Sequence, residues 1–333
     1  MTEPRSDAIG LRGAQGLPGA EALRQARAIV GAQLPATPTI RWPLLERRLG
    51  TTVYVKHENH TELGAFKLRG GAVYVQRLRQ REPQLRGLIS ATRGNHGQSI
   101  ARAGAHHGLA VTIVVPHGNS VEKNAAMRAL GATLVEHGED FQQAREHAAA
   151  LAAQQGLHMV PSFHEDLVCG VASYWLEFFE RAQPDVVVVP IGLGSGIVAC
   201  AAARAATGAR TRIVGVVSAH ATAYKDSFEA GRVVEAPVST ELADGMACRV
   251  PEAAALAIIC REVDEIVAVG DDAVAEAMRI YFSDTHNVAE GAGAAPLAAA
   301  LQRRGAWAGR HIGLALTGGN VDREVYARVL AAS

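Results

Sequence analysis

Residues 61–73 read TELGAFKLRGGAV, and Lys67 stands in this stretch between an aromatic and an aliphatic residue. The surrounding pattern is that of a buried segment, although burying an ammonium group is costly unless it is paired or neutralised. Two interpretations are open. Lys67 is either a helix lysine whose amine reaches water along a covered stem, or a lysine whose charge is removed by a covalent bond to an aldehyde.

The composition excludes several classes of protein. The chain has 333 residues, a formal net charge of +0 and 48% hydrophobic residues, which is enough for two domains or subdomains. Zero net charge offers no basic surface for nucleic acid or for an anionic membrane. No run of eighteen apolar residues predicts a membrane helix, and residues 1–19 read as a polar arm without an apolar signal core. Four cysteines without metal-binding spacing fit the reduced thiols of a cytoplasmic protein.

Short apolar runs alternate with alanine-rich segments along the chain. Valine- and isoleucine-rich runs that are nearly continuous are typical of strands buried on both faces of a parallel sheet. We expect strands at 52–55, 87–91, 111–115, 186–189, 213–217, 266–269 and 312–316. We expect helices at 20–30, 98–107, 121–130, 140–155, 199–206, 272–284 and 295–303. This alternation predicts an α/β fold.

The domain organisation follows from the middle of the chain. Residues 89–158 contain two strand–helix units of their own and are predicted to form a small inserted domain. Residues 1–88 and 159–333 would then form the larger domain.

Three polar or glycine-rich loops follow predicted strands, and ligands of open α/β sheets bind at the carboxyl ends of strands. The loop PIGLGSGIVA at 190–199 offers backbone amides before a helix, an arrangement that binds phosphate. A dinucleotide site is less well matched because the GxGxxG spacing is missing, and close packing is a further alternative. The loop ATRGNHGQS at 91–99 either binds a carboxylate of a ligand or is a polar turn that caps its own helix. The loop LTGGNVD at 316–322, taken alone, is a turn.

Six motifs together resemble the fold type II enzymes that use pyridoxal 5′-phosphate (PLP), the tryptophan synthase β-like group. In order they are KHENHTELGAFKLRGG, ATRGNHGQSIA, VPIGLGSGI, ELADGMA, AEGAGAA and LALTGGNVD. They span about Thr37 to Asp322, and within the group the chain is similar to serine/threonine dehydratases. The resemblance implies two three-layer α/β/α domains with mainly parallel sheets.

The resemblance also assigns the site residues. Lys67 would carry PLP on its amine and, once released, act as the general base. Phe66 would pack beside the ring, Asn95 would bind its 3-oxygen, and Glu290 would lie close by, unless it only starts a helix. The phosphate would be held by Gly192, Leu193, Gly194, Ser195 and Gly196. Thr317 falls beside the pyridine nitrogen, where a hydroxyl favours β-elimination over transamination. The substrate carboxylate would be bound by Thr92, Arg93, Gly94, Asn95 and His96.

The implied reaction converts a β-hydroxy-α-amino acid to a 2-oxo acid and ammonia by loss of water. L-Threonine and L-serine are the general expectation. The ATRGNHGQS form of the first loop also resembles phenylserine dehydratases and the dehydratase of hydroxyectoine breakdown. Side-chain pocket candidates, by adjacency to motifs only, are Leu63, His164, Cys169, Met246 and Ala247.

Three departures from the family sharpen this interpretation. Serine racemases carry a serine base at the position of Arg93, and arginine stays protonated, so we expect no racemisation. Arg93 either contacts an anionic group in the site or points away at the surface. The family's divalent-cation position has Val217, Ala221 and Ala223 here, so we expect no magnesium site. The chain ends at Ser333, so control by a C-terminal regulatory domain is not expected and a catabolic role is favoured.

Three rival classes remain. A β-replacement synthase would share the fold but use a second nucleophile. A non-enzymatic PLP-binding protein would keep the cofactor. A nicotinamide dehydrogenase would lack the yellow absorption band of lysine-bound PLP. The resemblance favours the dehydratase and a homodimer.

Overall fold

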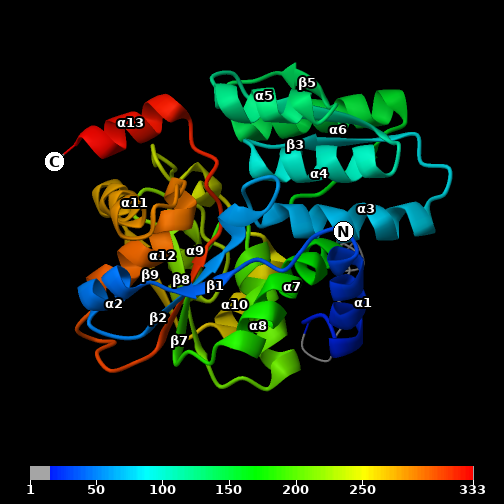
Figure 1. Ribbon diagram of the computed structural model, residues 1–333. Helices are drawn as coiled ribbons and strands as arrows, with labels where there is room; N and C mark the ends of the chain where they lie inside the picture. The colour runs from blue at the N-terminus through cyan, green and yellow to red at the C-terminus, as the bar shows by residue number, and fades with distance from the viewer. Residues whose placement is uncertain (1–15, 333) are drawn as a thin grey trace.

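Two sheets organise residues 16–332, the part of the chain that the structure, a computed structural model, describes (Figure 1). The larger sheet has the strand order β1-β2-β10-β7-β8-β9, and all its pairs are parallel except β1 with β2. Its strands are β1 (Thr39–Arg41), β2 (Val53–His57), β7 (Val186–Pro190), β8 (Arg212–Ser218), β9 (Glu265–Val269) and β10 (Ile312–Leu316). The α/β prediction with mainly parallel sheets is therefore confirmed.

Alternate residues of these strands face two separate apolar cores. On β7, Val187 and Val189 lie in one core while Val186 and Val188 lie in the other. The first core is covered by α1 (Ala20–Gly31), α7 (Glu165–Arg181), α8 (Ser195–Thr207) and α10 (Ala253–Glu262). The second is covered by α2 (Pro43–Leu49), α11 (Asp271–Thr285), α12 (Gly291–Gln302) and α13 (Arg323–Ala331). Helices on both faces explain why the strands read as continuous apolar runs.

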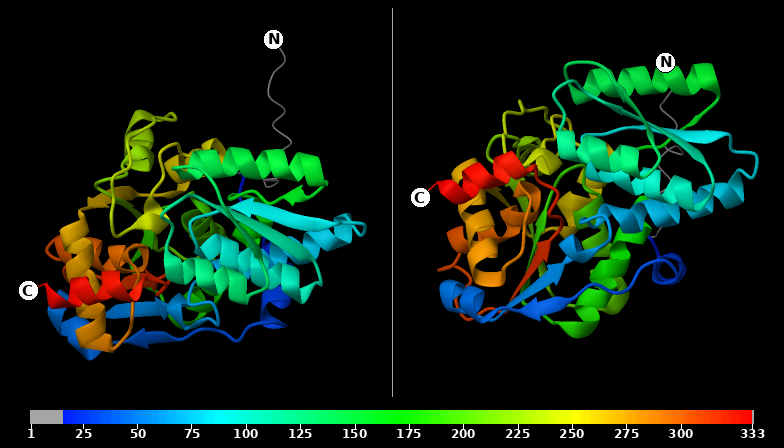
Figure 2. Two further views of the ribbon diagram at one scale, coloured as in Figure 1. Left: turned by 90° about the horizontal axis from the view of Figure 1, so that it is seen from above. Right: turned by 45° about the horizontal axis from the view of Figure 1, so that its top comes forward.

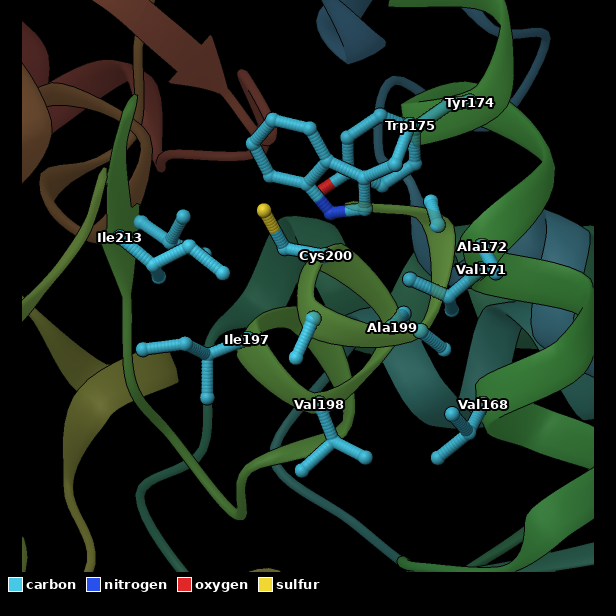
Figure 3. Close-up of a cluster of buried hydrophobic side chains, with 14 of the residues drawn as sticks. Val168, Val171, Ala172, Tyr174, Trp175, Ile197, Val198, Ala199, Cys200 and Ile213 are labelled. Atoms are coloured by element: carbon cyan, nitrogen blue, oxygen red, sulfur yellow. The ribbon is translucent and has the colours of Figure 1, made fainter. Parts of the chain in front are cut away.

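The first core contains Trp175, the largest fully buried side chain in residues 16–332. Figure 3 shows Trp175 and Tyr174 of α7 lying over Cys200 of α8, with Ile197 and Ile213 nearby. This packing fixes α8, and with it the glycine-rich loop that precedes α8.

The smaller sheet has the order β5-β4-β3-β6 and is wholly parallel. Its strands are β3 (Gly87–Ala91), β4 (Ala110–Val115), β5 (Thr133–Glu136) and β6 (His158–Met159). One face packs on α3 (Lys67–Arg81), α4 (Asn95–His106) and α5 (Val121–Ala129), and the other on α6 (Phe141–Gln155). Figures 1 and 2 show this sheet and its helices as a body beside the larger one, with α3 running between them.

The predicted strands all occur, but several further elements were not expected from the sequence. No sequence pattern singled out α2, α3, α7, α9 (Ala223–Ala230), α10, β1, β5 or β6. The expected helices at 199–206 and 295–303 are longer, because α8 begins at Ser195 and α12 at Gly291, with Pro296 inside α12. The domain boundaries at 89 and 158 stay a prediction, and most of the polar arm lies outside the described residues.

Candidate active site

Lys67 is the first residue of α3, and close helix packing holds its backbone. The Ser99 hydroxyl of α4 donates to the Lys67 carbonyl oxygen at 2.6 Å. A Cβ on Gly71 would overlap that same serine, so this glycine lets α3 and α4 approach, while its neighbour Gly70 faces α7. Phe66 is held as well, because its backbone N–H donates to the Thr317 carbonyl oxygen at 3.0 Å.

The Lys67 amine faces the glycine-rich loop. Lys67 Nζ donates to Ser195 Oγ at 3.0 Å and lies 4.9 Å from the centre of the Phe66 ring. Burial lowers the pKa of Lys67 from 10.5 to about 8, and Glu290 opposes this shift. A substantial fraction of the amine is therefore neutral near physiological pH, as a nucleophile or base requires.

The loop before α8 is shaped to leave its backbone open. Gly194 has φ of 96°, and a Cβ there would overlap the Ala255 side chain. A Cβ on Gly192 would overlap the Gly245 carbonyl oxygen. Trp175 Nε1 donates to the Gly196 carbonyl at 3.1 Å, while the amides at the start of α8 receive no side-chain cap. Uncapped amides at a helix N-terminus bind anions, which fits a phosphate.

The loop before α4 comes from the smaller sheet and ends beside Lys67. Thr92 Oγ1 accepts from the Gly94 and Gly97 amides at 3.0 and 3.3 Å, so this hydroxyl caps its own loop. His96 has a buried, unpartnered Nε2, and burial lowers its pKa to about 3. Arg93 is exposed, and its side chain has no partner within residues 16–332. Arg93 is thus the one predicted site residue that the fold leaves at the surface.

Asn95 and Glu290 form one wall of the candidate site through a direct hydrogen bond. Asn95 Nδ2 donates to Glu290 Oε1 at 2.8 Å, and Asn320 Nδ2 donates to Asn95 Oδ1 at 2.8 Å. Glu290 precedes α12 but its side chain does not cap that helix, which answers the alternative that it only starts a helix. Its Oε2 is buried without a hydrogen bond, and burial raises its pKa to about 7. Thr317 is buried in the same wall.

Three residues of this site were missed from the sequence. Lys123 of α5 donates to Asp244 Oδ2 at 2.6 Å and lies 3.8 Å from Glu290 Oε2. Asp244 and Asn320 stand in the motifs ELADGMA and LTGGNVD, so their polar side chains at loop positions were available signals. Lys123 lies outside every motif, and no local pattern marks it.

The pocket candidates separate into two groups. The Leu63 carbonyl accepts from Asn320, which places it at the wall, and Met246 lies in the 3₁₀ turn Asp244–Met246 beside Asp244. His164 instead caps α7 and packs on Tyr74, and Cys169 is buried in the first core. Neither of these two contacts Lys67 through a hydrogen bond or ring contact in the described part of the chain.

The residues present fit a phosphorylated aldehyde. Three features of the site call for a polar ligand: the Lys67 amine with its lowered pKa, the uncapped start of α8, and the buried atoms of Glu290 and His96 that lack hydrogen-bond partners. Within residues 16–332, no three His, Cys, Asp or Glu side chains are grouped to hold a metal ion. No helix of the same range is long and apolar enough to cross a membrane.

A buried lysine of lowered pKa that faces the start of a helix, between the two sheets, fits a site for an aldehyde cofactor. The family described as "Pyridoxal-phosphate dependent enzyme" matches residues 32–318. The chain belongs to this family, and it is of fold type II.

Characterised relatives narrow the comparison. An L-threonine ammonia-lyase of Geobacter sulfurreducens is 37% identical over 280 residues, covering 83% of this chain and 69% of the relative. An L-threo-3-hydroxyaspartate ammonia-lyase of Saccharomyces cerevisiae is 30% identical, covering 89% of this chain and 91% of the relative. The solved crystal structure of a T.th. threonine deaminase superposes with a TM-score of 0.84 at 31% identity, covering 92% of this chain and 99% of that chain.

Proposed function

We propose that this protein is a PLP-dependent ammonia-lyase that removes water from a β-hydroxy-α-amino acid. The unsaturated amine that leaves then takes up one water molecule and hydrolyses to a 2-oxo acid and ammonia. The observation that carries the proposal is the Lys67 amine, which has a pKa of about 8 and faces Ser195 at 3.0 Å. The relatives named above act as ammonia-lyases, which supports the reaction class.

The cofactor would be held by the residues that the resemblance assigned. Lys67 would bind its aldehyde, Phe66 would lie along the ring, and the loop 192–196 would bind the phosphate through backbone amides. Asn95, Glu290 and Thr317 would contact the ring substituents and nitrogen. When bound, PLP delocalises the electron pair left at Cα after proton removal.

The protein's own groups would then place and move the proton. The start of α4, with the amides of residues 93–96, would orient the substrate carboxylate. Lys67 Nζ, once free, accepts the Cα proton, and Ser195 Oγ keeps that nitrogen in place when no substrate is bound. Arg93 cannot act as a second base, so we expect elimination without racemisation.

L-Threonine and L-serine are the substrates we expect first. L-threo-3-Phenylserine and the hydroxyectoine-derived substrate remain alternatives, as does β-replacement with a second nucleophile. L-threo-3-Hydroxyaspartate is a further candidate, because a relative is named for it and the exposed Arg93 offers an unpaired cation. We also expect a cytoplasmic homodimer whose activity survives a chelator.

A substrate panel tests the proposal. Formation of 2-oxo acid would be followed with L-threonine, L-serine, L-threo-3-phenylserine and L-threo-3-hydroxyaspartate, and kcat/KM compared. The highest value for threonine supports a threonine dehydratase, whereas a preference for phenylserine or hydroxyaspartate would replace that substrate but keep the class. No 2-oxo acid from any of the four would refute these four substrates and leave the hydroxyectoine-derived substrate or β-replacement as the alternatives to test.

The variant Lys67→Ala tests the central residue. Turnover should fall by about 10³-fold or more, because both the cofactor anchor and the base are lost. The visible absorption of the cofactor should also disappear from the purified protein. Lys225→Ala, which removes a lysine from the surface helix α9, is the matched control and should behave as the parent.

A further inference from the structure

A second lysine reaches the candidate site from the other body of the molecule. Lys123 belongs to α5, beside the smaller sheet, and only 8% of its side chain is exposed. Its amine contacts Asp244 at 2.6 Å and approaches Glu290 Oε2 to 3.8 Å. Asp244 is one-third exposed, whereas 5% of the Glu290 side chain is exposed. The charge of Lys123 is therefore shared between a carboxylate that water can stabilise and one that water cannot reach.

The position of Lys123 is built into the fold. A Cβ on Gly94 would overlap Lys123 Cδ, so the glycine before α4 provides the space through which the lysine stem passes. The helix that carries Lys123 is capped by Ser120, which accepts from the Lys123 amide at 3.1 Å. The Ser120 hydroxyl also donates to Asp322, the residue that precedes α13. The amine thus arrives at Glu290 in a defined geometry.

Glu290 is surrounded by groups from several elements. Lys123 of α5 and Lys67 of α3 are the cations, Asp244 is the neighbouring anion, and Asn95 of α4 is the neutral donor. Burial raises the pKa of Glu290 to about 7, Lys123 lowers it and Asp244 raises it again. Loss of Lys123 would therefore favour the protonated carboxyl.

The charge of Glu290 controls the hydrogen bonds of Asn95. A carboxylate accepts the Asn95 Nδ2–H through Oε1 with full charge assistance, while Asn320 holds the other end of the amide. A protonated carboxyl is a weaker acceptor and can itself donate. The Asn95 amide would then be held less firmly by Glu290 and would be fixed mainly through Asn320.

We propose that Lys123 is a positioning residue for the proposed lyase reaction, which keeps Glu290 ionised so that its carboxylate orients the Asn95 amide. The proposal rests on the proposed function only for its effect on turnover. The effect on Glu290 itself is a property of the protein and can be measured without any substrate.

Infrared spectroscopy of the full chain tests the ionisation directly. The carbonyl band of a protonated carboxyl would be followed from pH 5 to 9, with and without added PLP, and assigned to Glu290 by its absence in Glu290→Gln. The variants are Lys123→Met, Lys123→Arg and Asp244→Asn. Glu122→Gln is the matched control, because this neighbour on α5 accepts from the Arg323 backbone amide and a glutamine keeps that acceptor.

The expected shifts have opposite signs. In Lys123→Met the Glu290 midpoint should rise by about one pH unit or more, and Lys123→Arg should restore it. In Asp244→Asn the midpoint should fall, so the proposal can be tested even if Lys123→Met does not fold. Glu122→Gln should leave the midpoint unchanged. A midpoint that is the same in Lys123→Met and Asp244→Asn as in the parent would overturn the proposal.

Kinetics separate this proposal from the lyase assignment. The acidic limb of the kcat/KM profile should move up in pH by the same amount as the infrared midpoint in Lys123→Met. A moved midpoint with no lyase activity in any variant would refute the proposed function but not the charge control. An infrared shift with an unmoved kinetic profile would mean that Lys123 does not position Asn95 for turnover, which contradicts the proposal.

Discussion

Two buried groups of charges start from the same turn of α3, and they differ in whether every charge is paired. Arg69 contacts Glu58 at 2.7 Å and Glu177 at 2.7 Å, and Glu177 also binds Lys56 at 2.6 Å. Ser173 and Thr37 accept further N–H groups of the same arginine. Around Lys67, by contrast, Glu290 Oε2 and His96 Nε2 have no hydrogen-bond partner among the described residues.

This difference in pairing gives two residues of α3 different roles, one structural and one chemical. A fully paired buried group contributes a fixed geometry, because any movement exposes an uncompensated charge. An incompletely paired group is costly in the free protein and is retained where a ligand completes it. Arg69 therefore anchors the start of α3, and Lys67, two residues earlier, remains available for chemistry.

Breaking the paired group should give the largest loss of stability. Arg69→Met leaves Glu58 and Glu177 with one cation, Lys56, and should cost about 3–5 kcal/mol in the free energy of unfolding. Urea denaturation followed by circular dichroism measures this value. Arg128→Met is the control, since the exposed pair of Arg128 with Glu136 should be worth less than about 1 kcal/mol. Equal effects of the two variants would contradict the assigned role of Arg69.

The two groups also differ in how far the sequence revealed them. The motifs around Lys67, Asn95, the 192–196 loop, Glu290 and Thr317 each follow a strand or start a helix. The loops at 91–99, 190–199 and 316–322 were expected at the carboxyl ends of strands, where ligands bind, and only the resemblance added Lys67 and Glu290 to them. The paired network has no such marker. Glu177 lies in the middle of α7, which no sequence pattern singled out, and its partners come from β2 and α3.

The site residues that the sequence did not reveal were missed for the same physical reason. Lys123 reaches Glu290 only because α5 packs against the smaller sheet and Gly94 leaves room for its stem. Neither condition is a property of the local sequence. The use of the Thr92 hydroxyl as a loop cap likewise depends on how α4 starts, which hydrophobic periodicity does not specify.

Removing the unpaired lysine should have the opposite sign to removing Arg69. The pKa of Lys67 falls from 10.5 to about 8 on folding, so the unfolded chain binds more protons between these values and stability rises with pH there. In the cofactor-free full chain, Lys67→Met should therefore be more stable by up to about 3 kcal/mol at pH 7, with the advantage lost by pH 11. Lys225→Met, at the surface, should show little change. A destabilised Lys67→Met would mean that the amine is well paired in the free protein.

Glu290 should give an effect that depends on pH in the reverse direction. Its pKa rises from 4.5 to about 7 on folding, so the folded chain binds more protons and loses stability as pH increases through this window. Glu290→Gln should remove this slope in the cofactor-free chain and be more stable than the parent by up to about 3 kcal/mol at pH 8. Glu177 provides the contrast, because Arg69 and Lys56 lower its pKa and its contribution is instead lost as pH falls below 4.5. Thermal unfolding between pH 2 and 8 covers both slopes. If Glu290→Gln kept the parental slope, its carboxyl would already be paired, and the distinction between the two charge groups would be wrong.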